Sequence, residues 1–189
     1  RDHVINLLDT PGHKDFSEDT YRVLTAVDSA LMVIDAANGV EAQTRRLIEV
    51  CRQRDTPIIT FVNKMDREVR DPLDILDEVE RELGMPCVPM TWPVGQGKTF
   101  GGIIHLNSQT MTVFESGSER RPQDFRTIPL SDRAQLLERF GHEFETAMES
   151  MELATGASPA WDHAAFLAGR QTPVFFGSGV NNFGVMEVL

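Results

Sequence analysis

The first third of the chain alternates short apolar runs with amphipathic stretches. The apolar runs have the composition of buried parallel strands, and they cover residues 3–9, 30–35 and 57–63. A helix is predicted to start near Asp15, because Asp15 and Glu18 have the spacing of a capping box, and a second helix covers 41–54. Strands that alternate with helices in this way predict an α/β fold, with a mostly parallel sheet wrapped by helices.

The pattern changes after Asp66. A helix is predicted over 71–84, with Gly84 at its end. Short extended segments between 87 and 115 follow, separated by glycine and polar turns. They favour a small antiparallel patch over a continuation of the parallel sheet.

Two further helices are predicted before the chain ends. The stretch 130–153 has the pattern of one long amphipathic helix with an internal glycine, Gly141, and Ser158 and Pro159 suit the start of another. The last stretch, 172–189, has the pattern of a strand, a glycine turn and the first turn of a helix. This order predicts three parts, namely a core over 1–66, an α+β insertion subdomain over 67–168 and a return to the core over 169–189.

Composition narrows the possible functions. The 189 residues carry a formal net charge of -11 at pH 7, so broad binding of DNA or other nucleic acid through phosphates is not expected. The sequence has no run of about 18 apolar residues, so no membrane span is predicted. Its two cysteines, Cys51 and Cys87, lie far apart without metal-ligand spacing, which favours reduced core thiols. We therefore expect a globular cytoplasmic chain that is monomeric.

The first candidate site is Asp9-Thr10-Pro11-Gly12-His13, at the end of the first apolar run. Ligands of open α/β sheets bind at the carboxyl ends of strands. An acid placed like Asp9 can hold Mg²⁺, usually through water, beside a triphosphate, and Gly12 lets its backbone N–H approach a terminal phosphate. His13 could orient an attacking water. The same residues also suit a simple turn, and alone they do not decide between the two interpretations.

The second candidate site is Asn63-Lys64-Met65-Asp66, directly after an apolar run. The Asp66 carboxylate can accept hydrogen bonds from both N1–H and the exocyclic amine of guanine, whereas adenine would leave it unpaired. Such a site can reject the wrong base by orders of magnitude. Asn63 can bridge neighbouring loops and the purine N7, while the stem of Lys64 lies over the ring face.

A third candidate lies in "FFGSGVNNFG", residues 175–184, where a strand is followed by Ser178 and Gly179. Ser178 could brace Asp66, and the Gly179 amide could reach the guanine O6. Glycine-rich turns of this kind are common, so the value of this motif comes from its order behind the other two.

The order "DTPGH", "NKMD", "GSG" resembles that of translational GTPases, the family that includes elongation factor G. The resemblance is dense over 4–105 and thinner over 115–165. It implies a P-loop-NTPase-like G domain that binds GTP or GDP with Mg²⁺ and hydrolyses GTP on the ribosome. The segments "SEDTYRVLTAVDSALMVIDA" and "PMTWPVGQGK" favour a factor of translation termination, whose functional partners would be class I release factors.

The resemblance also implies a role for each motif residue. Asp9 would be the magnesium-side acid, Gly12 would sense the γ-phosphate, and His13 would position water once the ribosome orders it. Thr10 and Pro11 would complete this nucleotide-binding motif. The residues that read guanine would be Asn63, Lys64, Asp66 and Ser178, with Gly179 at a position where the family commonly has alanine.

The segment "PVGQGKT", residues 93–99, looks like a phosphate loop but does not fit the pattern. That loop would need a glycine where Trp92 stands, and an extended segment follows instead of a helix. In the family the phosphate loop also precedes the magnesium acid. We therefore expect 93–99 to be a turn between strands of the insertion, and we expect the phosphate loop to lie upstream of Arg1. On this interpretation the chain alone would bind nucleotide poorly and would not hydrolyse it.

Two alternatives stay open on the sequence. One is an elongation-factor-G-like translocase or a ribosomal protection GTPase. The other is a non-catalytic module that keeps the GTPase fold for binding, which the intact "DTPGH" and "NKMD" motifs disfavour.

Overall fold

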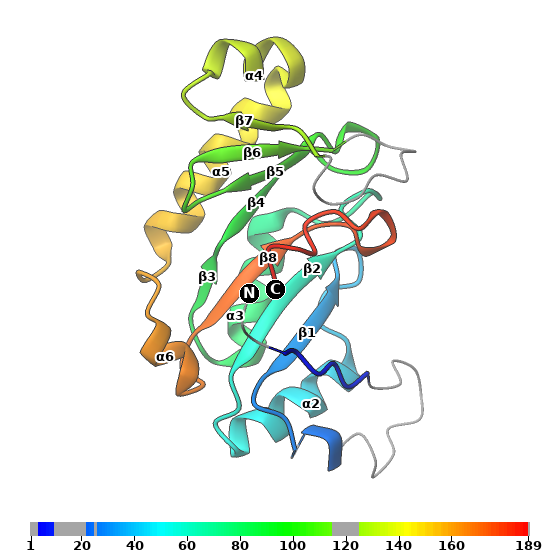
Figure 1. The fold of residues 1–189 in the computed structure, drawn as a ribbon, viewed down its shortest axis with the longest axis vertical. Coiled ribbons are helices and arrows are strands. Elements are labelled where there is room, and N and C mark those ends of the chain that lie inside the picture. Colours follow the sequence, from blue (N-terminus) through cyan, green and yellow to red (C-terminus); the bar gives the residue numbers. More distant parts are fainter. Residues whose placement is uncertain (1–3, 10–21, 25, 115–124, 189) are drawn as a thin grey trace.

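The computed structural model describes residues 4–9, 22–24, 26–114 and 125–188. Its first sheet has four parallel strands in the order β1-β2-β8-β3 (Figure 1). Asp35 lies opposite Asn63 and Val62 lies opposite Phe176, so three carboxyl ends meet at one edge of the sheet. The strands are β1 (Ala30–Asp35), β2 (Ile58–Asn63), β8 (Thr172–Phe176) and β3 (Cys87–Pro89).

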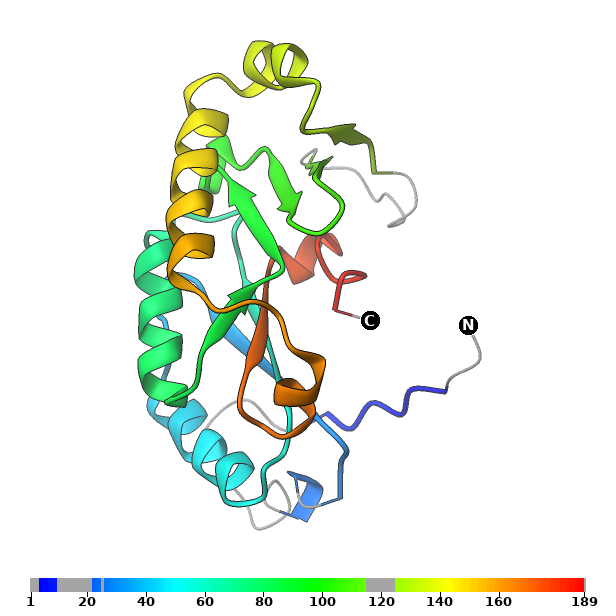
Figure 2. The ribbon, with the colours of Figure 1, turned by 90° about the vertical axis from the view of Figure 1, so that its left-hand side faces the viewer.

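Helices α2 (Ala42–Gln53) and α3 (Pro72–Leu83) pack side by side on one face of this sheet (Figure 2). The Asp71 side chain accepts a hydrogen bond from the Leu73 amide at the start of α3, and Gly84 ends the helix in a left-handed conformation with φ 62°. Both predicted helices are confirmed. Within α3, Glu78 turns inward and accepts a hydrogen bond from the Val40 amide at 3.0 Å, which ties this acidic helix to the loop after β1.

The second sheet is antiparallel, in the order β4-β5-β6-β7 (Figure 1). Trp92 of β4 joins it to the first sheet, because its buried ring meets the edge of Phe176 at 5.3 Å between centroids. The Trp92 indole N–H donates to Ser150 Oγ in a covering helix at 2.9 Å. The remaining elements are β4 (Thr91–Val94), β5 (Gly102–His105), β6 (Thr110–Val113), β7 (Thr127–Pro129), α4 (Arg133–Phe140), α5 (His142–Ala157) and α6 (His163–Leu167).

The strand predicted over 3–9 is not a strand in the described residues. Residues 4–9 are extended but exposed, with Val4 87% and Leu7 81% accessible, and no described ladder includes them. An apolar run becomes a buried strand only when a neighbour supplies its backbone hydrogen bonds. In the described part of the chain, β1 pairs with β2 alone.

The extended segments after residue 87 divide between the two sheets, which corrects the prediction of a single antiparallel patch. Cys87–Pro89 pairs in parallel with Thr172–Val174 of β8, and only the later strands are antiparallel. The chain crosses between the sheets at Met90, whose amide donates to the Val174 carbonyl at 2.8 Å. The apolar pattern could not show this crossing, since both strands are wholly buried.

The long helix predicted over 130–153 is two helices, α4 and α5, and the break falls at Gly141. Gly141 has φ 52° and ψ -127°, a conformation that is essentially confined to glycine. The amphipathic period continues through the break, so periodicity alone suggested one helix.

The last short helix also starts later than predicted. Ser158 ends α5 instead, since its Oγ donates to the Ala154 carbonyl at 2.8 Å. Helix α6 begins after Asp162, whose carboxylate accepts hydrogen bonds from the Ala164 and Ala165 amides.

Cys51 and Cys87 are buried free thiols, as predicted. Across the described residues no helix is both long and apolar enough to cross a bilayer.

Gly141→Ala should lower the free energy of unfolding by about 1–3 kcal/mol, because alanine would be forced into a backbone conformation that only glycine tolerates. Gly156→Ala in α5 is the matched control, since an added Cβ there would meet no atom within 4 Å. It should leave stability unchanged or raise it by up to about 1 kcal/mol. Denaturant unfolding of both variants measures this, and equal effects would contradict the assignment of the break to Gly141.

Candidate functional site

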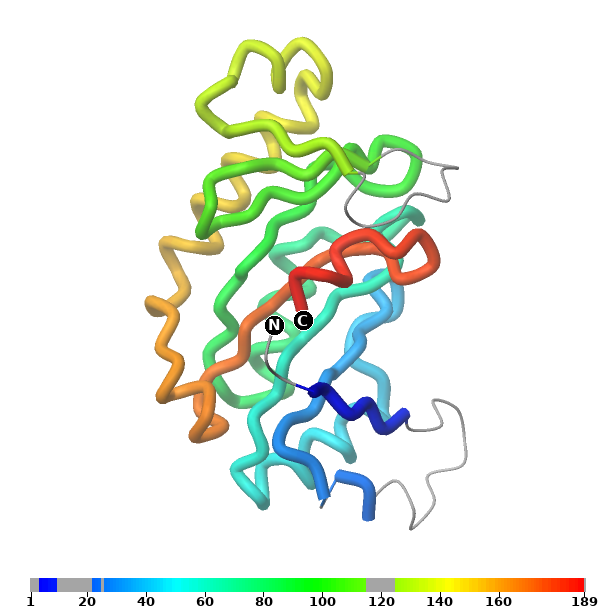
Figure 3. The backbone as a smooth tube through the Cα atoms, in the orientation of Figure 1, coloured from blue at the N-terminus to red at the C-terminus, as the bar shows by residue number. Residues whose placement is uncertain are grey.

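The loops after β2 and β8 lie side by side at the carboxyl edge of the parallel sheet. After β8 the chain forms a loop at this edge and then turns back across the parallel sheet (Figure 3). Within this region the Met65 amide donates to the Gly177 carbonyl at 3.1 Å, which joins the two loops through their backbones. The predicted residues Asn63, Lys64, Asp66, Ser178 and Gly179 are therefore brought together.

Asn63 holds both loops through one oxygen. Its Oδ1 accepts the amide N–H of Lys64 and the amide N–H of Gly179, each at 2.8 Å. The bridging role predicted for Asn63 is therefore present. Because two amides donate to Oδ1, the other side-chain atom must be the Nδ2 donor. The Gly179 amide, which was predicted to reach a guanine O6, already has this partner inside the protein.

Asp66 is braced as the sequence predicted. The Ser178 hydroxyl donates to Asp66 Oδ1 at 2.5 Å, and Ser178 is completely buried while Asp66 is half-buried. An ionised carboxylate has about four acceptor positions, of which this contact uses one. The carboxylate is thus fixed in direction but keeps the capacity to accept further hydrogen bonds.

Lys64 is held by the end of β1. Its Nζ lies 2.6 Å from Asp35 Oδ2, and its backbone has φ 74°, which is uncommon outside glycine. Partial burial raises the pKa of the Asp35 carboxyl, but the hydrogen bond from Lys64 and those from Ala37 and Asn38 outweigh it. The pKa of Asp35 is consequently lowered, so the carboxylate stays ionised opposite the ammonium group.

The segment 93–99 contacts the loop 63–66 through a backbone hydrogen bond. It forms the end of β4 and a 3-10 turn at Gly97–Thr99, which confirms a turn between strands. The Gly97 amide donates to the Met65 carbonyl at 3.0 Å, and the Met65 side chain is fully buried. Sequence reasoning missed this contact, because nothing in the local pattern places residue 97 beside residue 65.

Asp9 lies at the exposed end of the segment 4–9, and Thr10, Pro11, Gly12 and His13 lie outside the described residues. Within the described ranges, no group of three or more His, Cys, Asp or Glu side chains is arranged to hold a metal ion. The roles predicted for the "DTPGH" motif therefore stay predictions.

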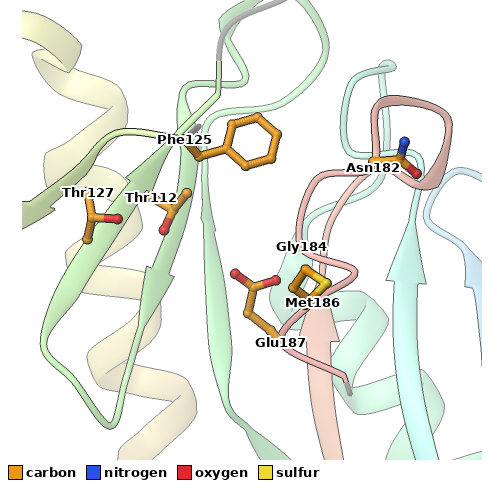
Figure 4. Close-up of a pocket in the computed structure, with 7 residues that line it drawn as sticks. All are labelled: Thr112, Phe125, Thr127, Asn182, Gly184, Met186 and Glu187. Atoms are coloured by element: carbon orange, nitrogen blue, oxygen red, sulfur yellow. The ribbon is translucent and has the colours of Figure 1, made fainter. Parts of the chain in front are cut away.

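A separate hollow of about 200 Å³ lies between the antiparallel sheet and the end of the chain (Figure 4). None of the candidate base-recognition residues lines it. Its walls are formed by Thr112, Phe125, Thr127, Asn182, Gly184, Met186 and Glu187.

The fold and the paired loops define a class of protein. The whole chain, residues 1–189, matches the family described as the elongation factor Tu GTP binding domain, and the chain belongs to that family. A crystal structure of a protein from Thermus thermophilus is similar, with a TM-score of 0.66 and 27% identity over 95% of this chain and 28% of that one. The predicted G-domain fold is confirmed.

Curated relatives point to one branch of that class. Proteins named peptide chain release factor 3 from Bordetella avium and Nitrosomonas europaea are 66% and 65% identical over the whole of this chain. The chain covers 35% and 36% of their lengths, so it spans about a third of these relatives. The similarity to a peptide chain release factor that the sequence predicted is thereby confirmed.

Asp35→Asn should destabilise the fold by about 0.2–1 kcal/mol at pH 7, since it removes a half-exposed ion pair. The pKa of Asp35 is lowered on folding, so its contribution is present above the unfolded pKa and is lost as the pH falls through the folded value. The difference between wild type and variant should therefore shrink as the pH drops below about 4. Urea unfolding at several pH values measures it, with Asp77→Asn in α3 as an exposed control. A difference that stays constant into acid would contradict the ion pair.

Proposed function

We propose that this chain is the guanine-nucleotide-binding part of a ribosome-dependent GTPase of translation termination. The whole protein would promote the departure of class I release factors from the ribosome in the cytoplasm and hydrolyse GTP to GDP and phosphate. The relatives named peptide chain release factor 3, similar along the whole chain, support this branch of the family.

The contact between Ser178 and Asp66 carries the proposal for base recognition. Guanine presents N1–H and an exocyclic amine on one edge, and a carboxylate can accept from both. The Ser178 hydroxyl donates to Asp66 Oδ1 and not to Oδ2, and this contact fixes the plane of the carboxylate. Adenine would place an acceptor, and not a donor, opposite Asp66. A half-buried carboxylate without a hydrogen-bond donor would cost binding free energy.

Asn63 and Lys64 would complete the base site. The Asn63 Nδ2, oriented by the two amides on Oδ1, would donate to the purine N7. The Lys64 stem, held at its end by Asp35, would lie along the face of the ring. The Gly179 amide would contact O6 only by sharing or exchanging its present bond to Asn63.

The "DTPGH" motif would supply the phosphate chemistry. Gly12 would approach the γ-phosphate and His13 would orient the attacking water. Asp9 offers an exposed carboxylate, which suits Mg²⁺ bound through water because Mg²⁺ keeps several waters of its own. When bound, Mg²⁺ would neutralise charge on the phosphates.

The direct test follows a labelled class I release factor as it leaves post-termination ribosomes, with the full-length protein present and with or without GTP. The proposal requires faster departure with GTP. Ribosome-stimulated GTP hydrolysis without faster departure would move the protein to translocation or ribosome protection. Neither activity, with guanine nucleotide still bound, would favour a non-catalytic binding module.

In the full-length protein, His13→Ala should abolish ribosome-stimulated GTP hydrolysis, because the attacking water would lose the group that orients it. GTP binding should persist, since the base loops are untouched. Single-turnover hydrolysis and nucleotide titration separate the two effects. Binding lost together with hydrolysis would show that His13 is a structural residue.

Asp66→Asn should shift the base preference from guanine toward xanthine. An amide can donate to the C2 carbonyl of xanthine, whereas it cannot accept from both donors of guanine. GDP affinity should fall by about a hundredfold or more, and xanthosine diphosphate should compete. Competition titration measures this, with Asp77→Asn as the control, and unchanged selectivity would sink the assignment of Asp66.

A further inference from the structure

The Ser178 hydroxyl that donates to Asp66 also contacts the side chain of a third residue, Asn181. Its side chain is half-buried and belongs to the 3-10 turn Gly179–Asn181, which follows Ser178 in the sequence. Asn181 Nδ2 lies 2.7 Å from Ser178 Oγ, and Ser178 Oγ lies 2.5 Å from Asp66 Oδ1. The three side chains form one chain of hydrogen bonds that ends at the carboxylate.

The direction of this chain follows from counting hydrogens. A serine hydroxyl has one hydrogen, and an ionised carboxylate can only accept. Ser178 must therefore give its hydrogen to Asp66 and can only accept from Asn181. That requirement fixes the Asn181 amide with its nitrogen toward Ser178, so the order is Asn181 to Ser178 to Asp66.

Burial makes this order matter. Ser178 has no exposed surface, so water does not reach its hydroxyl to replace a missing donor or to turn it. A donor at Asn181 favours the one rotation of the hydroxyl that serves Asp66. An acceptor at the same place would compete with Asp66 for the single hydrogen.

We propose that Asn181 is a positioning residue for base specificity, acting through Ser178 to hold Asp66 in the direction that reads the amine edge of guanine. This inference rests on the proposed role of Asp66. Asn181 itself need not touch the nucleotide, and its effect is transmitted by the Ser178 hydroxyl.

Asn181→Asp tests the inference with almost no change in shape, because it replaces the donating nitrogen with an accepting oxygen. In the full-length protein, GDP affinity should fall about tenfold or more. The preference for GDP over inosine diphosphate, which lacks the exocyclic amine, should narrow. If Asn181 only stabilised the loop, the substitution would weaken the binding of GDP and of inosine diphosphate by the same factor. That result would overturn the inference.

Asn182→Asp is the matched control. It introduces the same charge one residue further along, at an exposed position with φ 50° that aspartate tolerates well. It should leave the ratio of GDP to inosine diphosphate affinity unchanged. An equal narrowing in this variant would show that charge in the turn, and not the hydrogen-bond order, is responsible.

A double-mutant cycle with Ser178→Ala tests the route. Asn181→Ala should weaken GDP binding a few-fold in the wild-type background and have no further effect once the Ser178 hydroxyl is gone. The same loss in both backgrounds would overturn the inference. If the wild-type protein shows no preference for GDP over inosine and adenosine diphosphates, the proposed function fails instead, and the two failures are thereby distinguished.

Discussion

Two side-chain hydrogen bonds across the carboxyl edge of the parallel sheet hold the candidate site together. Asn63 Oδ1 accepts the Gly179 amide, and the Ser178 hydroxyl donates to Asp66. Both depend on the parallel register of β2 and β8, which sets Val62 opposite Phe176 and so starts the two loops at the same level. Ser178 and Asp66, 112 positions apart in sequence, thus meet at one edge of the sheet.

The segment 91–99, which contains β4 and the 3-10 turn after it, has a structural part in this site. Its Gly97 amide holds the Met65 carbonyl, while Trp92 packs against the last residue of β8, Phe176. The Gly97 contact supports the loop after β2, and the Trp92 contact supports the strand that leads to Ser178. The segment 91–99 therefore helps to position both loops.

The sequence predicted well wherever a local signal had a single physical meaning. The helix that ends at Gly84 and the strand 57–63 followed by "NKMD" were predictable, because helix-end glycines and apolar runs are local signals. The brace between Ser178 and Asp66 was predictable from the order of motifs. Contacts set by tertiary packing were not, among them Gly97 against Met65 and Asp35 against Lys64. The strand predicted over 3–9 was wrong for the same reason. A strand forms only where a neighbouring strand pairs with it, and the apolar run does not reveal that neighbour.

The central claim is that the paired loops at the sheet edge are the guanine site. Amide hydrogen exchange on the full-length protein, with GDP, with ADP and without nucleotide, tests it most directly. We predict that GDP slows exchange in the loops 63–66 and 177–182, that ADP does not, and that the β6 and β7 wall of the separate hollow is unchanged. Protection by both nucleotides alike, or protection elsewhere with these loops unaffected, would contradict the account.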